Sequence, residues 1–337
     1  MRAPSFNPAA DAAHDLPDRR LHALVWPVLL AMAGYLGFAL WSGWDDVIGA
    51  VRKIGYAGVG IALSLSLVNY ALRFARWQTY LAAMGHAVPW RPSLGIYLAG
   101  FALTATPGKA GEALRGLLLK RWKVPLPDSF AAFLSERLSD LLAVVLLALG
   151  GLALYPSARW PVAIGAAGVL SVFAVLLNRR FLEKTGQRVR GESRWPRLSR
   201  HVLQTLLRTR HCHAPRLFAV ATVLSLVAWF AEAFAFYLVL HWMGQTVPLF
   251  QAVFIYAAAM LAGALSFLPG GLGGAEAVMA SLLILSGMPG AEAAAATIVT
   301  RAVTLWFAVA IGGAALFGGT GAVSPGSGHP SPRGQET

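Results

Sequence analysis

A pair of charged residues that occurs twice, a Glu just past a backbone break and an Arg inside the following apolar stretch, carries a strong chemical signal in this sequence. Glu112 precedes Arg137 by 25 residues, and Glu276 precedes Arg301 by the same interval. A charged side chain at the centre of a membrane helix costs roughly 2.5–3.5 kcal/mol on insertion scales, so it needs a partner or a wet cavity. The repeated spacing predicts two Glu–Arg pairs. Either the pairs only lock neighbouring helices together, or the arginines bind an anionic head group while the glutamates hold them or take protons.

Three further charged residues are candidates for the same site. Asp140 and Glu232 also fall inside apolar stretches, and a carboxyl group at such depth is a candidate proton carrier because burial disfavours its charged form. Arg115 lies on a basic edge that either attracts anionic lipid or is a solvated face.

Each Glu of the repeated pairs follows a break made of proline and glycine. The first break contains Pro107, Gly108 and Gly111, and the second contains Pro269, Gly270, Gly271 and Gly273. Backbone amides freed by such residues find no water in hydrocarbon, so a break persists there only where protein or a polar cavity satisfies it. The glycines either allow close helix packing or expose amides at the start of a half-helix, where the dipole favours an anion.

The composition indicates a membrane protein. Of 337 residues, 57% are hydrophobic and only 13% are charged, whereas ordinary soluble domains carry about 25% charged residues. Much of the formal net charge of +13 lies in residues 179–216. This basic segment is typical of a cytoplasmic loop that follows the positive-inside rule, rather than of a nucleic-acid site. No enzyme signature is present, and we expect no catalytic residue, cofactor or metal.

Apolar runs predict about six membrane-spanning helices and two broken hairpins. The runs cover 23–42, 56–76, 129–154, 160–178, 217–241 and 291–317, and the broken stretches cover 93–122 and 249–288. Residues 44–55 are expected to form a short connection. We divide the chain into a cytoplasmic segment at 1–22, a membrane domain at 23–318 and a disordered tail at 319–337.

Charge counting favours re-entrant hairpins over spanning ones. If both hairpins return to the side they enter from, Arg73, Arg76, Arg91 and the 179–216 loop share one side, in agreement with the Lys/Arg bias. If both hairpins span, the first three of these arginines move to the outside.

The chain also contains an internal repeat. At an offset of 159, Leu65-Ser66-Leu67-Val68 matches Leu224-Ser225-Leu226-Val227, and at an offset of 164 Glu112 and Arg137 match Glu276 and Arg301. The repeats run over about 56–154 and 217–317. With re-entrant hairpins they have opposite orientations in the membrane, an arrangement typical of transporters. The predicted fold is thus an all-α polytopic membrane protein with an inverted repeat.

The repeated break with its following Glu, the segment Ser135-Glu136-Arg137-Leu138-Ser139-Asp140 and the pair Thr300-Arg301 resemble the transmembrane domain of lysylphosphatidylglycerol synthases, a flippase-like family. The resemblance covers about residues 20–318. It implies re-entrant hairpins and lipid translocation across the bacterial inner membrane, and stand-alone members are linked to diverse lipids. Full-length synthases carry a soluble aminoacyl-transfer domain, which is not expected here.

These observations favour a multi-pass lipid transporter of the bacterial inner membrane. Its partner would be an anionic phospholipid or lipid-linked precursor, with no nucleic acid. An accessory subunit or a membrane-embedded enzyme of lipid or lipid-linked glycan synthesis is the alternative. Association as a homodimer or with a lipid-modifying enzyme stays open.

Overall fold

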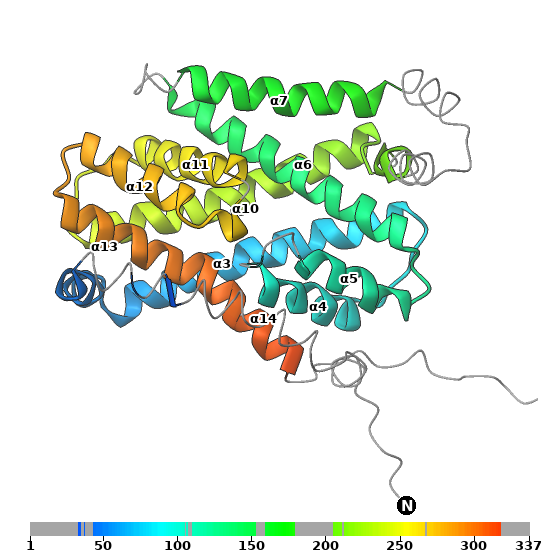
Figure 1. Ribbon diagram of the computed structural model, residues 1–337, viewed down its shortest axis with the longest axis horizontal. Coiled ribbons are helices and arrows are strands. Elements are labelled where there is room, and N and C mark those ends of the chain that lie inside the picture. Colours follow the sequence, from blue (N-terminus) through cyan, green and yellow to red (C-terminus); the bar gives the residue numbers. More distant parts are fainter. Residues whose placement is uncertain are drawn as a thin grey trace, which may run out of the picture.

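The computed structural model describes residues 33–34, 37, 43–104, 106, 110–152, 159–178, 205–210, 212–266 and 268–317. Within them every regular element is a helix, which confirms the all-α prediction. In chain order (Figure 1) they are α3 (Trp44–Ala83), α4 (Trp90–Ala99), η1 (Gly100–Leu103), α5 (Ala110–Lys120), α6 (Leu126–Gly150), α7 (Arg159–Leu177), α10 (Pro215–Trp242), α11 (Leu249–Leu265), η5 (Pro269–Gly271), α12 (Gly274–Leu285), α13 (Gly290–Arg301), η6 (Ala302–Trp306) and α14 (Phe307–Phe317). Most of the expected span at 23–42, and the tail at 319–337, lie outside the described residues.

Three helical stretches in the described part of the chain are long and apolar enough to cross a membrane. They are Trp44–Ala83, Pro215–Trp242 and the continuous stretch Gly290–Leu316. Shorter apolar helices occur at Val162–Val175, Leu249–Leu265 and Gly274–Leu285. The chain is therefore a helical membrane protein.

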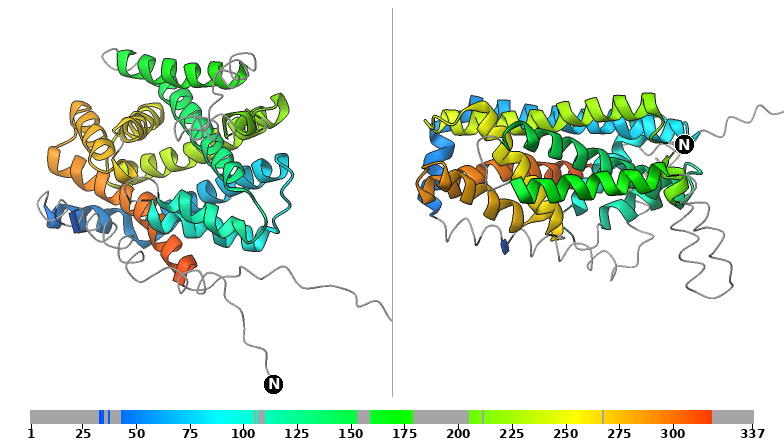
Figure 2. Two further views of the ribbon diagram at one scale, coloured as in Figure 1. Left: turned by 45° about the vertical axis from the view of Figure 1, so that its right-hand side comes forward. Right: turned by 90° about the horizontal axis from the view of Figure 1, so that it is seen from above.

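The core of the bundle is built on α3 and α10, which pack side by side in opposite directions (Figures 1 and 2). Near the start of α3, Gly58 lies so close to Trp242 that a Cβ atom would stand 2.9 Å from the indole ring. Nearer the end of α3, Arg76 donates a hydrogen bond to Ser225. The start of α3 therefore lies beside the end of α10, and the end of α3 lies nearer the start of α10, so the two helices are antiparallel. α7 lies at the edge of the bundle, against α6.

α11 and α12 form an antiparallel hairpin. At its open end the Gln251 side chain donates to Ser286 Oγ at 2.9 Å. At its closed end a Cβ on Gly263 would stand 3.0 Å from Cβ of Ala275. The turn is the predicted proline–glycine break, and Gly271 adopts a φ of +68° there. Only glycine adopts such a conformation without strain.

α4 and α5 form a second helix pair, at the other end of the bundle (Figure 1). α4 returns from the end of α3, and Trp77 Nε1 donates to Ser93 Oγ at 3.2 Å across that junction. α5 then packs back on α4 and η1. The Pro107–Gly108 break between the two helices lies outside the described residues.

The structure corrects two details of the sequence interpretation. Residues 44–55 are not an open connection, because α3 begins at Trp44 and has its non-helical kink at Gly55. The same helix continues to Ala83, beyond the expected end at 76. Arg73 and Arg76 therefore lie buried within α3 rather than at a membrane surface, and they do not belong in the charge count that orients the chain.

Candidate functional site

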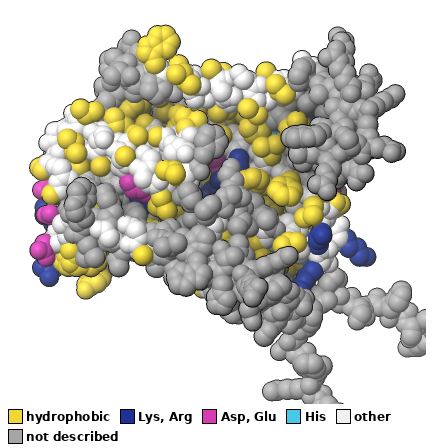
Figure 3. Space-filling model, in the orientation of Figure 1, with side chains coloured by type: hydrophobic (Ala, Val, Ile, Leu, Met, Phe, Trp, Pro, Cys, Tyr) yellow, Lys and Arg dark blue, Asp and Glu magenta, His cyan; other side chains and the backbone are white. Residues whose placement is uncertain are grey.

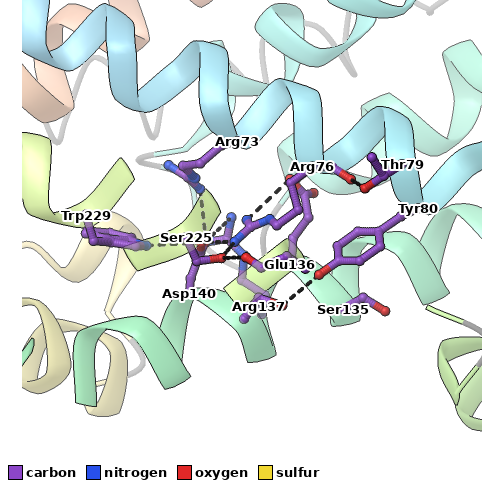
Figure 4. A network of polar contacts seen from close by, with 12 residues as sticks. Arg73, Arg76, Thr79, Tyr80, Ser135, Glu136, Arg137, Asp140, Ser225 and Trp229 are labelled. Carbon is purple, nitrogen blue, oxygen red and sulfur yellow. Dashed lines mark hydrogen bonds and ion pairs between the residues drawn. The ribbon is translucent and has the colours of Figure 1, made fainter. Parts of the chain in front are cut away.

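A cluster of buried arginines and carboxylates lies where α3 crosses α6 (Figure 4). From α3, Arg73 Nη2 lies 3.1 Å from Asp140 Oδ2, and Arg76 Nη1 lies 2.8 Å from Asp140 Oδ1. From α5, Arg115 Nη1 contacts Glu136 Oε2 at 3.0 Å. We call Arg73, Arg76, Arg115, Glu136, Arg137 and Asp140 the arginine cluster.

Helical spacing explains how so many charges meet at one place. Glu136 and Asp140 are four residues apart on α6, and Arg73 and Arg76 are three apart on α3. Residues at these spacings share one face of a helix. The two carboxylates therefore face the two guanidinium groups across the helix contact. Trp229 Nε1 on α10 completes the cluster by donating to Asp140 Oδ1 at 3.0 Å.

Arg115 is held by aromatic rings as well as by Glu136. Its guanidinium carbon lies 4.3 Å from the ring centroid of Tyr97 and 5.3 Å from that of Trp77. Such stacking suits arginine, whose planar group is weakly hydrated. A Cβ on Gly100 would stand 2.3 Å from Arg115 Nε, so glycine is needed where this side chain passes.

The described side chains of the cluster carry a formal excess of positive charge, because four arginines face two carboxylates. Arg76 is fully buried, and Nε of Arg73, of Arg76 and of Arg137 has no hydrogen-bond partner among the described residues. Arg137 is the most accessible member, with 34% of its side chain exposed and a looser contact of 3.5 Å to Asp140. Figure 3 shows charged side chains in the middle of one molecular face, among hydrophobic ones.

The second predicted pair, Glu276 with Arg301, is formed. Arg301 Nε donates to Glu276 Oε1 at 2.6 Å, and Arg301 Nη2 donates to the carbonyl of Gly270 at 2.8 Å. The other oxygen of Glu276 accepts the backbone N–H of Gly273 at 2.7 Å and so caps α12. Arg301 thus fastens the η5 turn to α13. This charge-balanced arrangement supports the structural role among the two that the sequence left open.

Glu232 belongs to neither group of ion pairs among the described residues. Its carboxylate accepts a 2.6 Å hydrogen bond from Tyr256 Oη, and both residues are buried. Its position on α10 is equivalent, at the offset of 159, to that of Arg73 on α3.

The outcome for the other predicted residues is mixed. Arg115, Arg137 and Asp140 come together in the arginine cluster, and Pro269, Gly270 and Gly271 form η5 beside Glu276. Pro107 and Gly108 lie outside the described residues, and only the backbone is described for Gly111 and Glu112 at the start of α5. The predicted pairing of Glu112 with Arg137 stays a prediction. Arg137 itself contacts Asp140 and Phe133.

Three site residues were not predicted from the sequence: Arg73, Arg76 and Glu136. The two arginines looked like the basic end of an apolar run, although the run resumes after them. Glu136 lies four residues before Asp140, a spacing that places both carboxylates on one helical face. That pattern was the available signal.

Comparisons with known proteins agree with the membrane fold. Residues 24–312 match the family described as the lysylphosphatidylglycerol synthase TM region. A protein of Methanothermobacter thermautotrophicus named UPF0104 membrane protein is 27% identical over 322 residues, which are 87% of this chain and 92% of that protein. One of Pyrococcus horikoshii with the same name is 21% identical, over 81% of this chain and 90% of its own length. Glycosyltransferase AglD of Haloferax volcanii is 28% identical over 131 residues, which are 37% of this chain and 20% of that protein.

Proposed function

The chain belongs to the lysylphosphatidylglycerol synthase TM-region family, and we propose that it is a flippase for an anionic phospholipid or lipid-linked precursor. We place it in the cytoplasmic (inner) membrane. The observation that carries this proposal is the arginine cluster, in which four arginines meet inside an apolar bundle and Nε of Arg73, of Arg76 and of Arg137 has no hydrogen-bond partner among the described residues. Buried guanidinium groups with donors to spare are costly unless an anion can reach them.

The arginine cluster offers the chemistry that lipid translocation needs. The barrier to unaided exchange between leaflets is removal of water from the polar head group, a cost that fixed hydrogen-bond donors can offset. Arg137 is the member best placed for first contact, because its side chain is partly exposed and its ion pair with Asp140 among the described residues is 3.5 Å long. The acyl chains would stay in the bilayer during the passage.

An inverted repeat gives the proposed transporter two equivalent halves. Asn69 Nδ2 donates to the carbonyl of Ala228 at 2.8 Å, and these two residues are separated by the repeat offset of 159. Such a contact between equivalent positions is what a twofold axis passing between α3 and α10 requires.

Two further hydrogen bonds recur in equivalent places. Tyr70 Oη donates to the carbonyl of Thr304. Trp229, which matches Tyr70 at the offset of 159, donates through Nε1 to Asp140, which matches Thr304 at the offset of 164. Near the ends of the long helices, His86 bonds Asp128, and Gln245 bonds Glu292 at the matching positions. Because α3 and α10 are antiparallel, the last two contacts lie at opposite ends of the bundle. They support opposite orientations of the halves, with both hairpins re-entrant.

Leaflet exchange in proteoliposomes tests the proposed function. Vesicles with purified protein and a trace of fluorescently labelled phosphatidylglycerol are treated with an impermeant quencher, and the rate of loss of the protected fluorescence is measured. We expect exchange at least about tenfold faster than in empty vesicles. Arg137→Gln should abolish most of this gain, and Arg137→Lys should have an intermediate rate because a point charge replaces a planar fork.

Arg91→Gln is the matched control, because Arg91 is exposed and outside the arginine cluster. It should exchange lipid as the unchanged protein does. Thermal unfolding in detergent verifies that each variant is folded. If folded protein accelerates exchange of no phospholipid and no isoprenoid phosphate, the proposed function is wrong.

An accessory role in lipid-linked glycan synthesis is the second candidate. The observation in its favour is the partial match to a protein named as a glycosyltransferase. In that case the arginine cluster would hold a lipid-linked substrate for a separate enzyme. Binding of a labelled isoprenoid phosphate without leaflet exchange would favour this role over transport.

A further inference from the structure

Glu232 is a buried carboxylate with no cationic group in contact among the described residues. Its described hydrogen-bond donor is Tyr256 Oη, and no Lys or Arg nitrogen of the described residues lies within 4.0 Å of it. The side chain is only 5% exposed. A carboxylate in such a place is costly to keep charged, whereas its protonated form is neutral.

Asp140 provides the contrast within the same bundle. Three guanidinium groups approach it, at 2.8, 3.1 and 3.5 Å, and the indole of Trp229 donates to it. Close positive charges favour the ionised form of a carboxyl group. Of the two carboxylates that the sequence left open as proton carriers, Glu232 is the one whose surroundings allow it to change charge.

Glu232 also stands close to the arginine cluster. It follows Trp229 by three residues on α10, so the two side chains share one helical face. Arg73 stacks over the Trp229 ring, with 5.5 Å between its guanidinium carbon and the ring centroid. A change of charge on Glu232 therefore changes the electrostatic potential at Arg73, where an anionic head group would bind.

The titratable groups that surround Glu232 come from four helices. They are Tyr256 on α11, Arg73 and Tyr70 on α3, Arg301 on α13 and Asp140 on α6. Arg301 is neutralised by Glu276, and Arg73 is shared with Asp140. Neither arginine forms an ion pair with Glu232.

We propose that Glu232 carries one proton together with each anionic head group, which makes the protein a proton–lipid symporter. This inference rests on the proposed lipid transport. On one side of the membrane the carboxylate takes a proton from water, its negative charge disappears, and the arginine cluster becomes more favourable for an anion. On the other side the carboxyl group returns the proton to water as the head group leaves. For a singly charged head group, no net charge crosses.

The test combines two signals in one proteoliposome preparation. Leaflet exchange of labelled phosphatidylglycerol is followed by quenching, and a trapped pH-sensitive dye reports the lumen. In the unchanged protein, an inwardly directed proton gradient should speed inward lipid movement at least about threefold, and the lumen should acidify as lipid moves.

Glu232→Gln is the decisive variant, because glutamine keeps the acceptor for Tyr256 but carries no titratable proton. We expect lipid exchange that no longer responds to the gradient, with no lipid-linked acidification. Asp45→Asn, at an exposed carboxylate, is the control and should respond to the gradient as the unchanged protein does. An infrared pH titration adds a readout without lipid, in which Glu232→Gln should lose one carboxyl band.

The possible outcomes distinguish a failure of proton symport from a failure of the proposed lipid transport. If lipid moves in the unchanged protein but the gradient has no effect, or if Glu232→Gln keeps the coupling, proton symport is wrong and lipid transport stands. If no lipid moves at all, both proposals fail.

Discussion

At the scale of single residues, the two halves use similar charges for different tasks. Arg301 donates hydrogen bonds to Glu276 and to the carbonyl of Gly270, so it stabilises the chain break. Its repeat equivalent, Arg137, stays partly exposed and contacts Asp140 loosely. The same residue type therefore stabilises a chain break in one half, whereas in the other half its side chain is partly exposed.

A double-mutant cycle on Arg301 and Glu276 tests the fastening role. Arg301→Ala leaves Glu276 buried without a cation, so it should lower the free energy of unfolding by roughly 3–5 kcal/mol. Glu276→Ala should cost a comparable amount and also lose the α12 cap, worth about 0.5–2 kcal/mol. The double variant should be less destabilised than the sum of the two. Thermal or denaturant unfolding in detergent measures all three, and additive losses would contradict the pairing.

At the scale of the helices, the closed end of the α11–α12 hairpin depends on a backbone contact between two glycines. A Cβ on Gly271 would stand 3.0 Å from Cα of Gly263, and the φ of Gly271 is +68°. Both the close approach and the left-handed backbone require glycine there.

Gly271→Ala should therefore destabilise the protein by about 1–3 kcal/mol. Gly287→Ala is the matched control, because Gly287 has a φ of +92° but open space around its missing side chain. It carries the backbone cost without the clash. A larger loss of unfolding free energy in Gly271→Ala measures the helix contact itself, and equal losses would show that the hairpin tolerates separation.

The helices could be predicted from the sequence more fully than the site could. Apolar length located α7 and α10 within two residues of their ends, and the repeated break located the η5 turn. These features depend on local composition. The arginine cluster depends on which helix faces meet, and only the crossing of α3 and α6 brings Arg76 to Asp140. Arg73 and Arg76 were misplaced because charges after an apolar run resemble a membrane boundary.

At the scale of the whole molecule, the two ends of the bundle differ in charge among the described residues. One of them is the end at which α3 and α5 end and α4, α6 and α10 begin (Figure 1). That end holds Arg91, Lys120, Arg121, Lys123, Arg208, Arg210 and Arg216. The opposite end holds Asp45, Asp46, Arg52, Lys53 and Glu292. By the positive-inside rule we expect the first of these ends to face the cytoplasm.

Cysteine labelling in intact cells tests this orientation, and the chain offers a quiet background for it. Cys212, the single cysteine, is fully buried, and burial raises the pKa of its thiol to about 11. At pH 7 only about one thiol in ten thousand would be the reactive thiolate. New cysteines introduced at exposed positions should therefore dominate the labelling signal.

An impermeant maleimide should label Asp45→Cys and Ala291→Cys in intact cells, because both positions are exposed at the acidic end of the bundle. Lys120→Cys, exposed at the basic end, should react only after the membrane is permeabilised. The unchanged protein, with Cys212 alone, should stay unlabelled under both conditions until it is denatured. If Lys120→Cys reacted in intact cells while Asp45→Cys did not, the orientation would be reversed. If both reacted from outside, residues 45 and 120 would lie on the same side of the membrane. The proposed topology would then be wrong, and so would the inverted repeat with re-entrant hairpins that depends on it.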